Sequence, residues 1–491
     1  MKLLTKILIN EFSQIRFYIF VIFAFAYSSL SLVNHYNYHT YAFDLGIYNN
    51  SIYQYGHFIN NPHPFGHLTV NNFLGDHFAL YTIIFSPLHY LFGTYTLLYI
   101  QIASILFGGA GIYKLVKSWY PNTLIPEIAL FHFFSFYGIF SALSFDYHDN
   151  VVGTMLVPWF IYYVHVNKLK YATIMAFLII IGKETLPLFL FSICLGLMVL
   201  YKKDKTRRTF SLILGLSSLV YGLIIINLVM PALVKQGVNA SHVQYSVLGN
   251  NGNEVLESLF YKSKYLITAL FCNVSNNALG NGVKEETYWC LLLSGGLCLF
   301  IRLEYALMLI TVIVQKMLND DGIKWGINYH YSVEFAPILI LAFYSSLIYF
   351  DSITFKLAIS LFFCLLTYST TFTKMFIRTS YWHSEAQSNV FSKLHYTSYF
   401  NRGNVNAIID MIPKDAKLSA LSSFGPHVSF RPNIYMFPDI NDANYIFVAE
   451  DPYGYPIGGP PLHNEIMKYK KSTDWQTITE INGIYLFKRI N

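Results

Sequence analysis

The chain has 491 residues, of which 54% are hydrophobic and only 12% are charged. A typical soluble domain carries about 25% charged residues, and a disordered chain has too few hydrophobic ones to form a core. This composition excludes a large soluble enzyme and a disordered protein, and it predicts a polytopic membrane protein. In such a protein the net charge of +6 reflects orientation, so we expect no nucleic-acid partner.

The predicted spans begin near the N-terminus, where three basic residues precede an apolar run that lacks a small-residue cleavage site. We interpret this run as an uncleaved first span with a cytoplasmic N-terminus. Apolar runs of near-membrane length lie at 16–34, 95–116, 124–143, 150–167, 209–229, 332–349 and 354–372. These runs predict a mainly α-helical membrane protein of the inner, cytoplasmic membrane.

Three further apolar stretches are irregular, and the basic clusters between spans decide how they are placed. Lys114 and Lys117 would lie outside if 78–92 crossed the membrane, so we expect an interfacial helix there, within a first outer loop of about 35–94. The same rule makes 171–201 and 287–318 hairpins of two short helices each, the first with an outward turn. The count is then about eleven spans.

Residues 375–491 differ in composition from the rest of the chain. They carry 10 of the 27 acidic and 11 of the 33 basic residues, as a soluble domain would. Strands are predicted at 417–421, 433–437 and 445–448, and a hairpin at 477–488 turns on Asn482-Gly483. We therefore expect a transmembrane domain at 1–374 and a small extracytoplasmic α/β domain at 375–491.

Polar residues that are unusual in a membrane protein collect at the predicted outer side. The first outer loop holds seven of the sixteen histidines but only two acids, Asp44 and Asp76. Ionisable groups at membrane depth are costly, so each needs a reason. Together they suggest an outward-facing cavity that binds substrate through Asp76, His77, Asp146, His148, Asp149, Lys183, Glu184, His330 and Glu334.

Each of these residues also has a purely structural interpretation. Asp44 is the N-cap of a helix from Leu45 in one interpretation and a catalytic residue in the other. Asp76, and either Asp146 or Asp149, would cap the helices that follow them. Lys183 and Glu184 would form a self-neutralising pair that only stabilises the hairpin. His63 and His67 have the spacing of a metal pair, but the prolines around them argue against a helix and a zinc site.

Several nucleotide and hydrolase motifs are absent from the sequence. There is no Walker A loop, no GxSxG or HExxH motif, and no dinucleotide fingerprint. We expect no cofactor, and a divalent metal is possible but not indicated. There is also no internal repeat of inverted halves, which weakens a secondary transporter.

Six sequence segments together resemble a family of bacterial membrane proteins, domain of unknown function 2079. They are FDLGIYNNSIYQYGHF (43–58), GDHFALYTIIFSPLHYLFG (75–93), SFDYHDNVVGTMLVPW (144–159), GKETLPLFLF (182–191), NYHYSVEFAPILI (328–340) and IPKDAKLSALSSFGPHVSFRPNIYMFP (412–438). The resemblance covers nearly the whole chain. Each segment alone is weak evidence for the resemblance, but the order and spacing of the segments make the match specific.

That family is similar to the GT-C superfamily of integral-membrane glycosyltransferases. The resemblance implies an essential Asp in the first outer loop, here Asp44, followed by the interfacial helix at 78–92. It also implies membrane lipid as a partner and a polyprenyl-phosphate-linked sugar donor.

The first functional hypothesis is therefore a GT-C-type glycosyltransferase with Asp44 as the general base and a carbohydrate, lipid or protein acceptor. Lys183 would hold the donor phosphate, with His148 or His330 assisting. The alternative is a transporter or lipid flippase that uses the same polar cavity, and a third possibility is a non-catalytic envelope or assembly protein.

Overall fold

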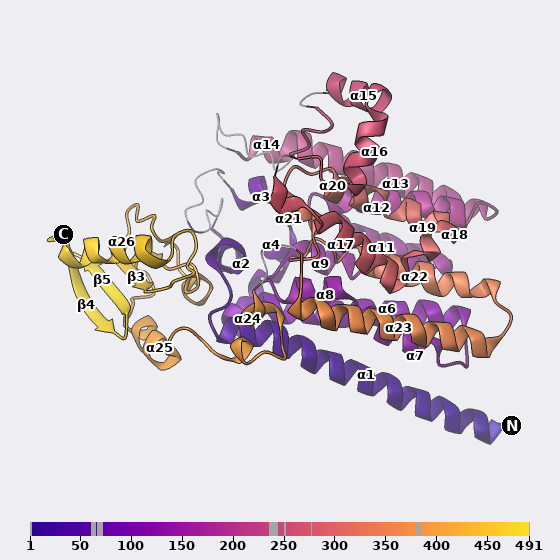
Figure 1. The fold of residues 1–491 in the computed structure, drawn as a ribbon, viewed down its shortest axis with the longest axis horizontal. Helices are drawn as coiled ribbons and strands as arrows, with labels where there is room; N and C mark the ends of the chain where they lie inside the picture. The colour runs from indigo at the N-terminus through magenta and orange to yellow at the C-terminus, as the bar shows by residue number, and fades with distance from the viewer. Residues whose placement is uncertain are drawn as a thin grey trace.

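The computed structural model describes residues 2–59, 65, 72–234, 244–249, 252–275, 277–379 and 384–490. Within these residues the fold is mainly helical, with one small sheet near the C-terminus. Figure 1 shows the sheet beyond one end of the helical bundle, next to α2 and away from the N-terminus of α1. This arrangement is the predicted fold class in its coarse form: a helical bundle with a C-terminal α/β segment.

The helices of the bundle follow the predicted apolar runs closely. In the first half of the chain they are α1 (Lys2–Tyr36), η1 (Ala42–Gly46), α2 (Ile47–Gly56), α3 (Phe73–Asp76), α4 (Tyr81–Phe85), η3 (Ser86–Leu88), α5 (His89–Phe92), η4 (Gly93–Tyr95), α6 (Thr96–Trp119), α7 (Ile125–Phe134), α8 (Tyr137–Leu143), α9 (Asp149–Thr154), α10 (Val157–His165), α11 (Leu169–Ile180), α12 (Leu186–Leu200) and α13 (Lys205–Ile224).

In the second half they are η5 (Ile225–Val229), α14 (Met230–Ala232), α15 (Gly252–Tyr261), α16 (Ser263–Phe271), η6 (Ala278–Gly280), α17 (Val283–Leu291), η7 (Leu292–Gly296), α18 (Cys298–Ile301), α19 (Leu303–Met308), α20 (Ile310–Met317), α21 (Gly322–Trp325), α22 (Phe335–Ser346), η8 (Leu347–Tyr349) and α23 (Ile353–Phe376).

Four helical stretches among the described residues are long and apolar enough to cross a membrane. They are Ser13–Tyr36, Tyr81–Trp119, Lys205–Ala232 and Ile353–Phe376. The bent pair α7 and α8, with 42° between its axes, adds a fifth if it is one span. The other apolar helices are shorter, so length and composition identify four or five candidate spans among the described residues.

Two of the three predicted irregular stretches, 78–92 and 171–201, are broken where the sequence suggested. The stretch 171–201 is a pair of helices, α11 and α12, with the turn between them at residues 181–185. The stretch Tyr81–Trp119 has 39 residues, roughly twice what a bilayer core of about 30 Å needs. A break at Gly93, with a φ of +56°, separates its first helical turns from α6.

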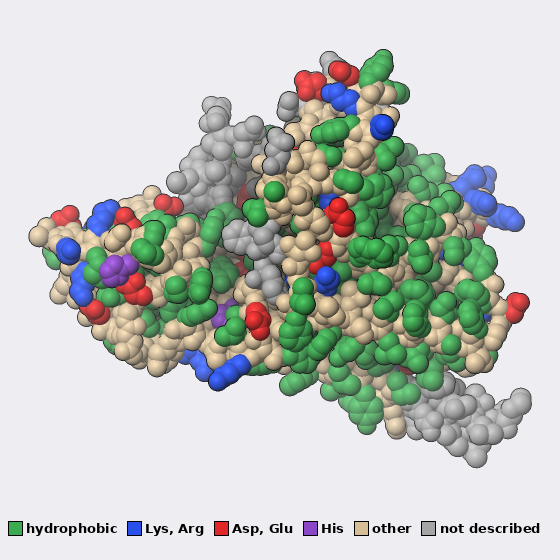
Figure 2. All heavy atoms as spheres, in the orientation of Figure 1, with side chains coloured by type: hydrophobic (Ala, Val, Ile, Leu, Met, Phe, Trp, Pro, Cys, Tyr) green, Lys and Arg blue, Asp and Glu red, His purple; other side chains and the backbone are tan. Residues whose placement is uncertain are grey.

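The bundle packs around α22, whose residues are all buried. Its neighbours α6, α7 and α10 contribute buried aromatic and branched side chains to the same core. Hydrophobic side chains cover the outer face of the bundle, while charged side chains gather at its two ends (Figure 2). An apolar girdle between charged ends is the surface expected of a protein in a bilayer.

The C-terminal sheet has five strands in the order β2-β1-β3-β5-β4. They are β1 (Leu418–Ala420), β2 (Ile434–Met436), β3 (Tyr445–Ala449), β4 (Trp475–Ile481) and β5 (Ile484–Arg489). β1 pairs in parallel with β2 and β3, whereas β5 runs antiparallel to β3 and β4. The strands predicted from the sequence, including the hairpin on Asn482-Gly483, are therefore confirmed.

Four helices complete this segment: α24 (Glu385–Ser388), η9 (Lys393–Tyr396), α25 (Arg402–Met411) and α26 (Gly459–Lys471), with the short η10 (Gly425–Val428) between β1 and β2. The segment packs directly on the first loop. The Ala42 amide donates to the Ser422 carbonyl at 2.8 Å, and the Asn50 side chain donates to the Ser429 carbonyl at 2.7 Å. A Cβ at Gly425 would lie 2.7 Å from that of Ala42, so only glycine permits this close approach.

Candidate functional site

Asp44 lies in η1, a single π-helical turn at the start of the first loop. The next helix, α2, begins after Gly46 with no side-chain cap, so the interpretation of Asp44 as a helix cap is wrong. Its carboxylate instead extends to His148, with 3.3 Å between Asp44 Oδ1 and His148 Nε2. Single π turns are frequent at functional sites, because they re-aim one side chain.

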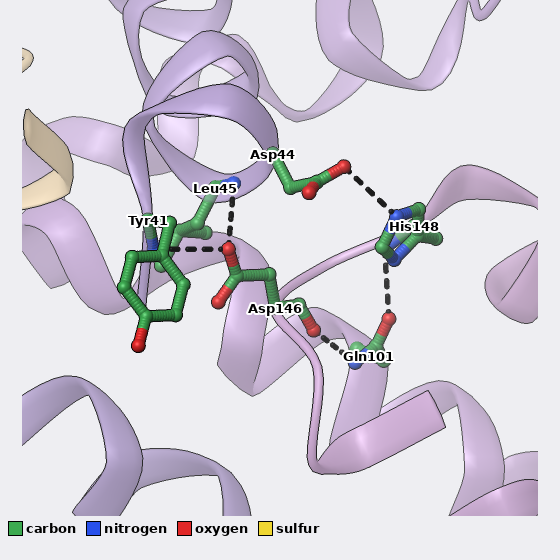
Figure 3. Close-up of polar contacts among 6 residues, drawn as sticks. All are labelled: Tyr41, Asp44, Leu45, Gln101, Asp146 and His148. Carbon is green, nitrogen blue, oxygen red and sulfur yellow. Dashed lines mark hydrogen bonds and ion pairs between the residues drawn. The ribbon is translucent and has the colours of Figure 1, made fainter. Parts of the chain in front are cut away.

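Asp146 supplies the cap that the first loop lacks. Its Oδ2 accepts the backbone amides of Tyr41 at 3.1 Å and Leu45 at 3.2 Å, and so fixes η1 from a different part of the chain (Figure 3). Burial, reinforced by the nearby Asp44 carboxylate, raises the pKa of Asp146 well above its usual value. A raised pKa favours the protonated form of Asp146, which is the form that does not repel Asp44.

The backbone around Asp146 is held in a strained shape. Asp146 has a φ of +50°, which is uncommon outside glycine. Gln101, in α6, holds the segment at two points: it donates to the Asp146 carbonyl and accepts the His148 amide, both at 2.9 Å (Figure 3). Strain of this kind persists where surrounding contacts fix it, which is common at binding and active sites.

His148 joins the first loop to the loop before α22. Its ring stacks on the His330 ring, with 3.6 Å between centroids, and Phe145 stacks at 5.7 Å. Burial lowers the pKa of His148, although Asp44 opposes that shift. The ring is thus neutral near pH 7, and the proton lies on Nε2, because the carboxylate of Asp44 can only accept.

Two more of the sequence-predicted residues join this group. The Glu334 carboxylate accepts the Asn150 amide at 2.6 Å, and the Asp149 carboxylate accepts the Tyr147 hydroxyl at 2.7 Å. Neither acid caps its own helix: the N-cap position before Asp149 has no side-chain hydrogen bond. We call Asp44, Asp146, His148, Asp149, Asn150, His330 and Glu334 the Asp44 cluster.

Lys183 and Glu184 lie in the turn between α11 and α12, but they do not form the expected pair. Glu184 binds His77 Nδ1 at 3.3 Å and the Phe78 amide at 3.1 Å. Burial would raise the pKa of Glu184, but the charges of His77 and Lys183 outweigh it and lower the pKa to about 2. The interpretation as a self-neutralising pair is therefore wrong, because the hydrogen-bond partners of the Glu184 carboxylate come from residues 77 and 78 and not from Lys183.

Lys183 is 8% exposed, and its ammonium group makes no hydrogen bond or ion pair within the described ranges. The charge of Lys183 acts electrostatically on four members of the Asp44 cluster: His148, Asp149, His330 and Glu334. A buried ammonium group in that position provides positive potential without a fixed counter-ion.

Asp76 ends the short helix α3 and does not cap α4, whose N-cap Leu80 has no side-chain hydrogen bond. Asp76 and the Asp44 cluster share a neighbour, Tyr48, which is a buried residue of α2. Burial raises the pKa of Tyr48, and the carboxylates of Asp149, Glu184, Asp44 and Asp76 add to that effect. All the sequence-predicted residues thus lie around one region, at the end of the bundle that faces the sheet.

The cluster contains an unusual number of buried polar atoms without a partner in the described part of the chain. They are Asp146 Oδ1, His148 Nδ1, Asp149 Oδ2, Asn150 Oδ1 and His330 Nδ1. Buried polar groups are nearly always hydrogen-bonded, and each unmade bond costs about 1–3 kcal/mol. Five such atoms within one cluster indicate a place where a polar ligand or ordered water completes the bonding.

Sequence reasoning missed Gln101 and Asn150. Gln101 could have been found from the sequence, because it is a glutamine within the apolar run of α6 and a side-chain amide inside a membrane helix needs a hydrogen-bond partner. No group of three or more His, Cys, Asp or Glu that could hold a metal ion occurs among the residues described. His63 and His67 lie outside those residues.

A search of curated proteins finds no match to this chain. The family model described as "Predicted membrane protein (DUF2079)" matches residues 34–486, which include the first loop, the bundle apart from most of α1, and nearly all of the sheet. The match spans every segment on which the sequence resemblance rested. The chain therefore belongs to the DUF2079 family of membrane proteins.

Proposed function

We propose that this protein is an integral-membrane glycosyltransferase of GT-C type. It would transfer a sugar from a polyprenyl-phosphate-linked donor to an acceptor at the outer face of the membrane. The observation that carries the proposal is the contact between Asp44 and His148, within a buried cluster that has five polar atoms without a partner among the described residues. A carboxylate held by a neutral imidazole is a plausible general base for a hydroxyl acceptor.

In the proposed reaction the acceptor hydroxyl lies against the second carboxylate oxygen of Asp44. His148 Nε2–H holds the first oxygen and so orients the group. Asp44 takes the hydroxyl proton as the acceptor oxygen bonds to the anomeric carbon of the donor. The bond from that carbon to the phosphate oxygen breaks, its electron pair leaves with the polyprenyl phosphate, and the anomeric configuration inverts.

Lys183 is the residue we assign to the donor phosphate. The leaving group carries negative charge, and a fixed positive charge in a water-poor site stabilises that charge as it develops. Lys183 is almost fully buried and lies close enough to act on His148 and Asp149. The ligand would provide the counter-ion that we do not find for Lys183 within the described residues.

The proposed topology places the Asp44 cluster outside. It has about eleven spans, a cytoplasmic N-terminus, a transmembrane domain at 1–374 and an extracytoplasmic domain at 375–491. The charge rule supports it, because Lys114/Lys117, Lys168/Lys170 and the run from Lys202 to Arg208 then all face the cytoplasm.

A cysteine at Thr473, an exposed position before β4, tests the topology. In a Cys272→Ser background, which removes the exposed native thiol, it should react with an impermeant maleimide in intact spheroplasts. Labelling only after lysis would contradict the eleven-span arrangement.

Asp44→Asn tests the chemistry. Asn keeps a hydrogen-bond acceptor for His148 but cannot take a proton, so turnover should fall at least about 100-fold while the fold is retained. The measurement is mass spectrometry of lipid and glycan extracts from deletion cells that carry either form. We expect an accumulated polyprenyl-phosphate sugar, or a glycan lacking one residue, in deletion and Asp44→Asn cells alike. Normal extracts in Asp44→Asn cells would refute the transferase and favour transport.

A further inference from the structure

The loop between β3 and α26 presents tyrosines to solvent. Tyr453 is 78% exposed and Tyr455 is 50% exposed. Tyr399, from the segment before α25, lies against Tyr453 with 5.9 Å between ring centroids and is itself 63% exposed. Three large aromatic rings that share one surface are costly to leave in water, so they are candidates for ligand contact.

This surface adjoins the first loop at the residue next to Asp44. Phe43 packs edge-on against Tyr455, with 6.1 Å between the ring centroids. Tyr41 also connects the two parts of the chain. Burial raises its pKa, and it lies close enough to Asp146, in the Asp44 cluster, and to Asp451 and Tyr399, at the loop surface, for these groups to raise the pKa further. The tyrosines and the proposed catalytic carboxylate are thus parts of one continuous region.

The same loop borders a pocket with largely apolar walls and a few polar groups. This open pocket of about 400 Å³ is lined by Glu450, Asp451, Pro452, Gly459, Pro460, His463 and Asn464. Two of its residues, Glu450 and His463, bind each other at 2.8 Å. Sites for small ligands typically have volumes of about 300–1,000 Å³ and combine apolar walls with a few polar groups.

Hydrogen bonds within the loop fix its conformation. The Gly459 amide donates to the Asp451 carbonyl at 2.9 Å, and the Tyr453 amide donates to the Asp451 side chain at 2.9 Å. The pocket and the tyrosines therefore hold their relative positions through Asp451. This preorganisation lowers the cost of ordering a ligand-binding surface.

We infer that this loop surface, formed by Tyr399, Tyr453, Tyr455 and the Glu450–Asn464 pocket, binds the carbohydrate chain of the acceptor. The inference deepens the proposed function and rests on it. A pyranose ring offers a face of C–H groups that packs on the negative face of an aromatic ring. Its hydroxyl groups match the carboxylates, the imidazole and the amide of the pocket, which both donate and accept hydrogen bonds.

A membrane-interface role for these tyrosines fits less well. Aromatic belts also contain Tyr, but Glu450 and Asp451 lie beside the rings, and acids are not favoured against an anionic lipid surface. The carboxylates and the imidazole of the pocket would have no role at such an interface. A saccharide accounts for the rings and the pocket together.

Saturation-transfer NMR on the full chain in detergent micelles tests the inference, with three probes: maltohexaose, chitohexaose and mannohexaose. At least one should bind, and Tyr453→Ala with Tyr455→Ala should weaken it by about tenfold or more. The matched control is Ile478→Ala, an exposed apolar side chain of β4 in the same segment, which should leave binding unchanged.

Two outcomes would overturn the inference: no binding of any probe, or binding that the tyrosine variants leave intact. Weaker association of the tyrosine variants with phosphatidylglycerol vesicles, without an effect on saccharides, would also refute it and assign the rings to the membrane. Asp44→Asn should bind the probe normally. Saccharide binding in a protein whose Asp44→Asn form keeps full activity would refute the proposed transferase but not the saccharide site.

Discussion

Lys316 and Lys183 are two lysines buried to a similar degree, yet their surroundings differ completely. Lys316, in α20, donates to the Gly326 carbonyl at 2.6 Å, the Tyr331 carbonyl at 3.1 Å and the Ser332 hydroxyl at 3.1 Å. All three ammonium protons are used. Lys183 makes no such bond to the residues described.

The difference separates a structural cation from one that is available to a ligand. Lys284 belongs with Lys316, because it donates to the carbonyls of Ala269 and Cys272 and lies over the Trp325 ring. Burial alone therefore does not identify function in this protein. The informative feature is a buried polar group whose bonding is incomplete, and such groups concentrate in and beside the Asp44 cluster.

Replacing each of the first two lysines by methionine tests the comparison most strongly. Lys183→Met should reduce activity on the order of 100-fold or more, because it removes the charge assigned to the donor phosphate, and it should leave folded yield near wild type. Lys316→Met removes the donor that binds two backbone carbonyls and the Ser332 hydroxyl, so it should destabilise the fold by about 3 kcal/mol.

The readouts are the glycan and lipid profiles used for Asp44 and the thermal unfolding of purified protein. If Lys183→Met lowers folded yield as much as Lys316→Met does, Lys183 is structural after all. Restored activity in Lys183→Arg would support a role for the positive charge itself.

The sequence predicted the local features of this molecule well. The strands of the C-terminal sheet lie within a residue or two of their predicted positions, because Asn482-Gly483 and the alternation around it determine a hairpin. The hairpin of α11 and α12 followed from basic residues at both of its ends. These features depend on neighbours in the chain.

The partners within the site could not be predicted in the same way. Glu184 pairs with His77, which is 107 positions away, rather than with its neighbour Lys183. Asp44 is positioned by Asp146 through backbone amides, and Gln101 in turn holds Asp146. Sequence patterns can gather such residues at one end of a bundle, but only packing decides which of them meet.

Gln101→Leu should have a smaller effect than Lys183→Met. The substitution keeps the volume but removes both bonds that hold the strained segment, so His148 loses its fixed orientation. We expect activity to fall on the order of tenfold, since small displacements of catalytic groups are costly. Gln101 is a positioning residue, so a shifted pH profile of activity should accompany the loss. A drop in unfolding temperature with an unchanged pH profile would indicate a merely structural role.

The smallest expected effect concerns the pH dependence of stability. Glu184 and Asp146 should contribute to it with opposite signs. The pKa of Glu184 is lowered from 4.5 to about 2, so its contribution is present above pH 4.5 and is lost as the pH falls toward 2. The pKa of Asp146 is raised above 3.8, so wild-type stability falls as the pH rises above that value.

Thermal unfolding between pH 3 and pH 8 should therefore separate Glu184→Gln from Asp146→Asn. The deficit of Glu184→Gln relative to wild type should be largest above pH 5, at most about 3 kcal/mol, and should shrink in acid. Asp146→Asn should gain on wild type as the pH rises, because Asn imitates the neutral acid at every pH. Parallel curves for both variants would mean that the two acids share one environment. The assignment of a lowered pKa to Glu184 and a raised pKa to Asp146 would then be wrong.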